Sequence, residues 1–68
     1  MTIQITVNGG PQEVPAGHSI AALVQELDLG DKRVAIEVNE QIVPRSTYPQ
    51  HILRSGDRVE VVTAIGGG

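Results

Sequence analysis

The sequence contains no cysteine, no phenylalanine and no tryptophan, and Tyr48 is its single tyrosine. The absence of cysteine excludes a disulfide scaffold, a thiolate zinc site and a cysteine nucleophile within these 68 residues. Without several aromatic side chains, the chain lacks the stacking platform typical of proteins that bind single-stranded nucleic acid. The core must therefore be built from Val, Ile, Leu and Ala, within a sequence that is 40% hydrophobic.

Basic residues are also few, since five of them face eight acidic residues and the net charge is −3. A nucleic-acid-binding domain normally carries a basic face, so we expect no nucleic-acid partner. No apolar run approaches the roughly 20 residues of a membrane span, and the N-terminal residues lack the basic stretch of a signal peptide. We therefore expect no membrane partner, a cytoplasmic location and one small domain.

Three segments alternate apolar and polar residues with the period of a half-buried strand. They are residues 2–7 (TIQITV), 34–38 (VAIEV) and 58–65 (RVEVVTAI). The Asn-Gly pair at residues 8–9 favours a tight hairpin that leads into a short return strand, "QEV", stopped by Pro15. A second turn, within "NEQIVPR", leads into another short strand that Pro44 ends.

Residues 18–30 (HSIAALVQELDLG) form the one segment with clear helical spacing. Ser19 is placed to cap its first turn, and Gly30 is suited to a left-handed residue after its end. The apolar stripe of this helix is Ile20, Leu23, Val24 and Leu27. We expect a loop or short helical turn over "STYPQHIL", with Ile52 and Leu53 filling the core beneath it.

The order of these elements predicts an α+β roll of the β-grasp, or ubiquitin-like, type. A mixed sheet of four to five strands packs on one main helix, and the first and last strands are parallel neighbours in its middle. We expect residues 1–65 to form this domain and residues 66–68 to form a flexible glycine tail.

No group of residues in this sequence has the spacing of a resident active site. His18 and His51 are far apart, with no cysteine and no carboxylate spacing that favours a metal site, so we interpret both as solvated loop histidines. The serines and threonines lack the sequence context of a nucleophile and are read as caps and turn residues. We expect no catalytic residue, no bound metal and no resident cofactor.

The tail, Gly66, Gly67 and Gly68, follows a strand with no polar spacer. Three extended residues reach about 10 Å, and a thread without side chains fits a narrow channel that presents a terminal carboxylate at its far end. A frayed end with no function is the alternative. Beside the tail, Val62 and Ala64 form either a covered sheet face or a docking patch, and Arg58 and Arg45 are alternative candidates for its polar rim.

Several stretches together resemble the ThiS family of sulfur carriers in bacterial thiamine biosynthesis, over nearly the whole chain. They are "AG-S-I" at residues 16–20, "VN-x-x-IVPR" at 38–45, the ring of Tyr48, "GD-x-V-E-V-V" at 56–62 and the terminal Gly-Gly. The terminal Gly-Gly alone is shared by all ubiquitin-like carriers. The "VPR" and "GD" stretches at this spacing are more specific.

The resemblance implies a chemistry at Gly68. An E1-like adenylyltransferase (ThiF-type) would use Mg-ATP to adenylate its carboxylate, a persulfide donor would convert it to a thiocarboxylate, and thiazole synthase (ThiG-type) would receive the sulfur. Gly66 and Gly67 would pass through the partner's channel. The chain would then be a protein cosubstrate, monomeric on its own, and not an enzyme.

Other members of the same architecture remain open alternatives. One alternative is that the chain is the small subunit of molybdopterin synthase or a carrier for cysteine or methionine synthesis. Another alternative is a ubiquitin-like modifier, or a binding module whose tail has no chemistry. Lys32 is the only lysine, so no set of chain-forming lysines is present as in ubiquitin.

Overall fold

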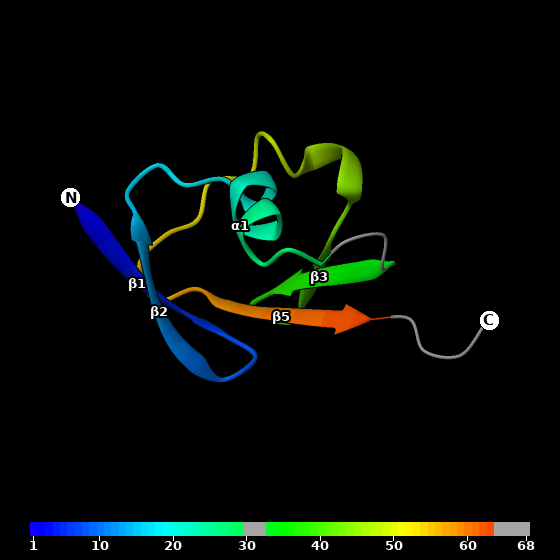
Figure 1. The fold of residues 1–68 in the computed structure, drawn as a ribbon, viewed down its shortest axis with the longest axis horizontal. Helices are drawn as coiled ribbons and strands as arrows, with labels where there is room; N and C mark the ends of the chain where they lie inside the picture. The colour runs from blue at the N-terminus through cyan, green and yellow to red at the C-terminus, as the bar shows by residue number, and fades with distance from the viewer. Residues whose placement is uncertain (30–32, 64–68) are drawn as a thin grey trace.

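A computed structural model describes residues 1–29 and 33–63 of the chain. These residues form a single sheet in the order β2-β1-β5-β3-β4, with the helix α1 on one of its faces (Figure 1). β1 and β5 are parallel, and the other neighbouring pairs are antiparallel. The elements in chain order are β1 (Thr2–Val7), β2 (Gly10–Pro15), α1 (Ile20–Glu26), β3 (Val34–Val38), β4 (Gln41–Val43), the 3-10 helix η1 (Arg45–Thr47) and β5 (Arg58–Thr63). The predicted β-grasp roll is thereby confirmed.

Both hairpins turn through two residues with positive φ. Asn8 and Gly9 have φ angles of 51° and 84° between the paired residues Val7 and Gly10. Asn39 and Glu40 have φ angles of 52° and 70° after Val38. Turns of this left-handed kind match the right-handed twist of the strands they join, and asparagine followed by glycine tolerates them best. The Asn-Gly prediction for the first hairpin is confirmed.

The helix α1 begins where the sequence predicts and ends earlier. The Ser19 side chain accepts a hydrogen bond from the backbone N–H of Ala22, as an N-cap does. Ile20 and Leu23 are buried, whereas Val24 is half-buried. The helix ends at Glu26, and Asp28 has the positive φ of 52° that was expected at Gly30, which lies outside the described residues. Aspartate tolerates this conformation better than most residues, so the helix stops two residues earlier than expected.

One of the two expected core plugs after η1 is exposed. Leu53 is buried with 2% exposure, as predicted, but Ile52 is 46% exposed, so that part of the prediction is wrong. The segment is extended: the N–H of Leu53 donates to the His18 carbonyl, and the N–H of Ile20 donates to the His51 carbonyl. Because side chains alternate along an extended segment, Leu53 and Ile52 must point to opposite sides.

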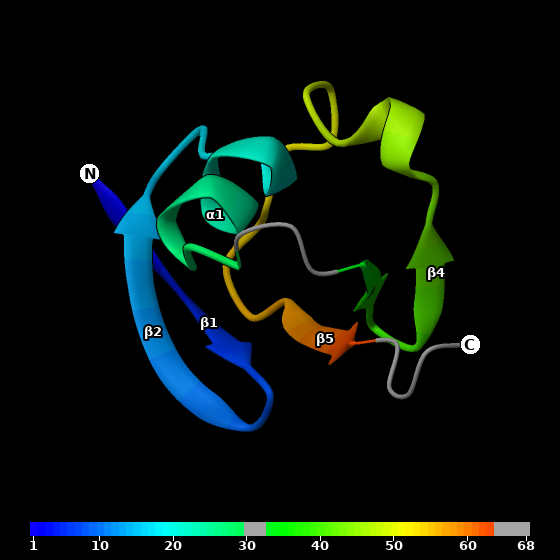
Figure 2. The ribbon, with the colours of Figure 1, turned by 45° about the vertical axis from the view of Figure 1, so that its right-hand side comes forward.

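The core lies between α1 and the sheet, and the segment that follows β4 closes its open side (Figure 2). β2 and β4 form the two edges of the sheet. Tyr48 is buried and belongs to the same core cluster as aliphatic residues from every strand and from the helix. These aliphatic residues are Ile5, Val14, Ile20, Leu23, Ile36, Val38, Val43, Leu53 and Val59.

Candidate functional site

β5 is the strand that leads toward the predicted reactive end of the chain. Its last described residue, Thr63, is paired with Val34 of β3. Ala64 and the tail of Gly66 to Gly68 lie outside the described residues, as does the expected domain boundary after residue 65. The site is therefore built from the residues that fix the course of β5 and from the faces that β5 presents.

β5 is held along its length on one side and only at its start on the other. β3 pairs with it from Val34↔Thr63 to Val38↔Val59. β1 pairs with it only at Thr6↔Arg58 and Val7↔Val59. Past that point Asn8 replaces the strand: its N–H donates to the Val59 carbonyl at 2.8 Å, and its Oδ1 accepts from the Val61 N–H at 2.7 Å. A side chain of the first turn thus extends the sheet ladder by one step along β5.

Replacement of Asn8 by glycine is expected to loosen the middle of β5 without straining the turn, since glycine adopts a positive φ freely. Loss of one hydrogen bond should cost about 1 kcal/mol, or a fall of roughly 4–8 °C in the thermal midpoint. Amide hydrogen exchange at Val61 should become faster. Asn8→Asp keeps the acceptor oxygen and should retain most of the protection. Unchanged exchange at Val61 in Asn8→Gly would show that the side chain does not hold the strand.

The start of β5 is fixed by two of the sequence stretches that carry the family resemblance. Asn39 of the "VN" stretch donates through Nδ2 to the Asp57 carboxylate at 3.1 Å, and its Oδ1 accepts from the Arg58 N–H at 3.0 Å. Asp57 of the "GD" stretch also accepts from the Arg54 N–H at 2.9 Å. Both stretches therefore have a structural role, because together they join the β3–β4 turn to the entry of β5.

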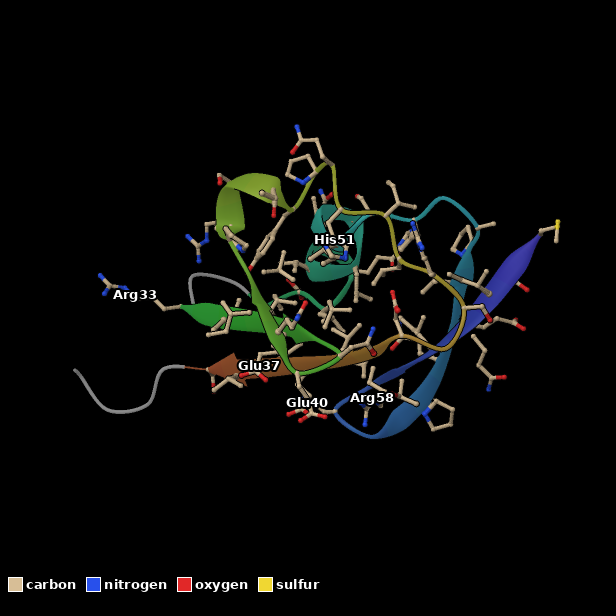
Figure 3. The ribbon with its side chains drawn as sticks, turned by 180° about the vertical axis from the view of Figure 1, so that it is seen from behind. Arg33, Glu37, Glu40, His51 and Arg58 are labelled. Carbon is tan, nitrogen blue, oxygen red and sulfur yellow. The ribbon has the colours of Figure 1, made fainter. Side chains whose placement is uncertain are left out.

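The predicted docking residues do not all lie together. Arg58 and Val62 lie on the same face of β5, which is the face away from α1, and Val62 is 48% exposed. Arg58 pairs with Glu40 at 3.3 Å, and Figure 3 shows both on the side of the sheet opposite the helix. Arg45 begins η1, beyond the edge strand β4, so β3 and β4 separate it from β5. The structure thus groups Val62 with Arg58 and leaves Arg45 apart.

Sequence reasoning missed three residues on this face. Ile42, at 71% exposure, lies on β4 directly opposite Glu37 of β3, and Glu37 lies directly opposite Glu60 of β5. Alternation along each strand already places all three on the outward side. Only the register between the strands, which the sequence does not show, brings them into one row.

The two histidines have different surroundings. His18 was expected to be a solvated loop residue, but its side chain is only 12% exposed and its Nε2 lies 3.0 Å from a carboxylate oxygen of Glu26. This contact links the residue before the helix cap to the last residue of the helix. His51 is half-buried beside β4. Within residues 1–29 and 33–63, no three metal-ligating side chains form a cluster that could hold a metal ion.

None of the helical residues that the structure describes forms a segment long and apolar enough to cross a membrane. α1 covers only Ile20–Glu26, well short of the roughly 20 residues needed.

Comparison with known proteins relates nearly the whole chain to one family. The sequence profile of the ThiS family matches residues 5–68. The chain is 35% identical over 66 residues to the sulfur carrier protein ThiS of Escherichia coli. This alignment covers 97% of this chain and 100% of the Escherichia coli protein. It is 38% identical over 66 residues to a thiazole synthase of Paramagnetospirillum magneticum. That alignment covers 97% of this chain, but the chain spans only 20% of the length of the thiazole synthase.

Structural comparison agrees with the sequence relationship. The fold matches the crystal structure of the thiamine biosynthesis protein ThiS from Geobacter metallireducens with a TM-score of 0.82 and 29% sequence identity. That match covers 97% of this chain and 100% of the Geobacter chain. Because the profile, a full-length relative and a solved structure all agree, the chain belongs to the ThiS family.

Proposed function

We propose that this chain is a sulfur carrier for the synthesis of the thiazole ring of thiamine, and that the carboxylate of Gly68 carries the sulfur. The observation that supports this most directly is the pair of relationships described above. A stretch like this chain occurs alone in a sulfur carrier and also as one fifth of a protein named thiazole synthase. A carrier and the enzyme that uses its sulfur act on the same chemistry, which favours thiazole synthesis over molybdopterin or amino-acid synthesis.

The proposed chemistry takes place on the carbonyl carbon of Gly68. A carboxylate is a poor electrophile, so an E1-like adenylyltransferase first joins it to AMP from Mg-ATP and releases pyrophosphate. The terminal sulfur of a persulfide donor then attacks the carbonyl and displaces AMP. A thiol cleaves the resulting sulfur–sulfur bond, and the thiocarboxylate that remains gives its sulfur to thiazole synthase. No cysteine is needed in the carrier, since the sulfur is bound to its backbone carbon.

In this reaction the chain is a protein cosubstrate and its partners are the enzymes. The partners supply the Mg-ATP, the acid–base groups and the charge stabilisation for the transition states. We assign the folded body to residues 1–65 and the reactive tail to residues 66–68, and we place the reaction in the cytoplasm, where a carrier of this kind meets its enzymes.

The tail alone cannot account for partner binding. Ordering each tail residue costs about 1–2 kcal/mol, whereas a micromolar complex needs about 8 kcal/mol of net binding free energy. Most of that free energy must therefore come from the folded body. A surface close to the end of β5 is the part of the body best placed to supply it.

Intact mass spectrometry tests the proposal. Incubation with ATP, the E1-like enzyme and a persulfide donor is expected to exchange one oxygen for sulfur, and the mass gain should map to the C-terminal fragment. Oxidation of Met1 gives nearly the same gain, so the N-terminal fragment must be measured as the control. A C-terminal fragment that never changes mass would exclude the carrier function.

A further inference from the structure

The turn between β1 and β2 contains the one place in this sequence where an asparagine or aspartate is directly followed by glycine. It is the pair Asn8–Gly9, and both residues are exposed. Figure 2 shows this turn at the end of the hairpin, away from α1. Asparagine before glycine is chemically labile, because the carboxamide carbon and the next backbone nitrogen can close a succinimide ring. Glycine carries no side chain beside that nitrogen, so ring closure meets little steric hindrance.

The carboxamide of Asn8 is held at its oxygen only. Its Oδ1 accepts from the Val61 N–H at 2.7 Å, whereas no hydrogen bond joins its Nδ2 to any other residue in the part of the chain that the structure describes. Nδ2 is the group that leaves as ammonia when asparagine is deamidated. The leaving group of Asn8 is therefore not retained by any described contact.

Asn39, the other asparagine of the sequence, differs from Asn8 in each of these respects. Its Nδ2 donates to the Asp57 carboxylate at 3.1 Å, and its Oδ1 accepts from the Arg58 N–H at 3.0 Å, so the carboxamide is held at both ends. The residue that follows it is Glu40, whose side chain hinders attack by the backbone nitrogen. Asn39 is also exposed and lies in a two-residue turn, which makes it an internal control for Asn8.

The hydrogen bond to Val61 controls access to the reactive geometry, because it turns the Asn8 carboxamide toward β5. Ring closure requires the Cγ atom of Asn8 to reach the backbone nitrogen of Gly9. The main chain of the turn is fixed as well, since the Asn8 N–H donates to the Val59 carbonyl at 2.8 Å. Displacement of a reacting group by about 1 Å can cost roughly 100-fold in rate. The reaction must therefore proceed from molecules in which the turn has detached from β5.

We propose that Asn8 is a deamidation site of this protein, and that the hydrogen bond from the Val61 N–H gates its modification. The backbone nitrogen of Gly9 loses its proton and attacks Cγ of Asn8, so that a C–N bond forms. The side-chain NH2 group takes up a proton and leaves as ammonia. Water then opens the succinimide: attack at the main-chain carbonyl gives isoaspartate, and attack at the side-chain carbonyl gives aspartate. The inference does not depend on the proposed function.

The two products affect β5 differently. Aspartate in place of Asn8 keeps an oxygen that accepts from the Val61 N–H. Isoaspartate adds a methylene group to the main chain within a two-residue turn, so the pairing of Val7 with Gly10 across that turn must shift. Val61 has no other described partner on this side of β5, because β1 pairs with β5 only at Thr6 and Val7. Isoaspartate should therefore loosen β5, and aspartate should not.

The test follows deamidation of the whole chain, folded in buffer and unfolded in concentrated urea, at the same mildly alkaline pH. Trypsin separates the two asparagines, because it cleaves after Lys32 and Arg33 and again after Arg45. Mass spectrometry should show that the fragment with Asn8 exchanges one NH for one O. This exchange should be at least about fivefold slower in the folded protein, since at least one hydrogen bond must break first. The fragment with Asn39 should stay unchanged in the folded protein.

The products are identified on the aged protein itself. Isoaspartyl methyltransferase with labelled S-adenosylmethionine detects isoaspartate, and chromatography separates this form from the aspartate form. The isoaspartate form should show faster amide hydrogen exchange at Val61 and a thermal midpoint lower by roughly 4–8 °C. The aspartate form should stay close to the unaltered chain. The variant Asn8→Gly has no carboxamide, so its N-terminal fragment should keep its mass.

Three results would overturn the proposal. An N-terminal fragment of unchanged mass, under conditions that deamidate a short reference peptide containing Asn-Gly, would exclude Asn8 as the site. A folded protein that reacts as fast as the unfolded protein, or faster, would show that the hydrogen bond to Val61 does not gate the reaction. Equal modification of Asn39 and Asn8 in the folded protein would show that exposure alone determines the site.

Discussion

Removal of Gly68 is expected to abolish adenylation and leave the fold intact. The shortened chain still ends in glycine, but its carboxylate is displaced by about 3.3–3.6 Å. Displacement of a reacting group by about 1 Å can cost roughly 100-fold in rate, so we expect a loss of at least that size in ATP–pyrophosphate exchange. The thermal midpoint should not change, because the body from β1 to β5 keeps all of its packing.

The matched control for this deletion is Gly66→Ala, which keeps the length of the tail and its last two glycines. We expect it to retain most of the adenylation activity, since the carboxylate stays at the same reach. Deletion of Gly68 with full activity would mean that the reactive group is not its carboxylate. A large fall in the thermal midpoint would mean that the tail is part of the folded body.

The second large effect is expected from Ile36→Ala, which should unfold most of the protein at 25 °C. Ile36 has 0% exposure and lies at the centre of β3, facing α1. Truncation of a buried isoleucine to alanine costs about 2–5 kcal/mol. A core of this size seldom supplies more than about 3–5 kcal/mol in total. Far-ultraviolet circular dichroism with urea titration measures the loss.

Ile42→Ala is the matched control, because it makes the same substitution on the neighbouring strand at a residue that faces outward. Its effect on the free energy of unfolding should stay within about 0.5 kcal/mol. Equal losses in the two variants would show that Ile42 contributes to the core. A stable Ile36→Ala protein would show that the sheet and α1 are not held together by this contact.

Local patterns in the sequence determined most of the elements. Alternation in residues 2–7 and 34–38, the Asn-Gly pair and the Ser19 cap each act within a few residues, and the structure confirms all of them. The two local errors have physical reasons. The left-handed residue after the helix is Asp28, two positions before the predicted Gly30. The direction of the Ile52 side chain depends on long-range hydrogen bonds to the segment before α1.

The candidate site was also predicted only in part from the sequence. The lack of cysteine and of any nucleophile context directed attention to the glycine tail, and the resemblance to the ThiS family made Gly68 the predicted reactive residue. The docking residues stay predictions. Val62 and Arg58 are an even number of residues apart on β5 and so share a face, whereas β3 and β4 separate Arg45 from β5.

By itself, the sequence determined which residues face the core and which face outward, because side-chain direction follows from alternation within one strand. Only the tertiary structure decided which outward residues are neighbours. The opposition of Glu37 and Glu60 depends on the register between β3 and β5, which are distant in the chain. That register is set by packing of the whole core and by the hydrogen bonds of Asn8, Asn39 and Asp57, which no local pattern contains.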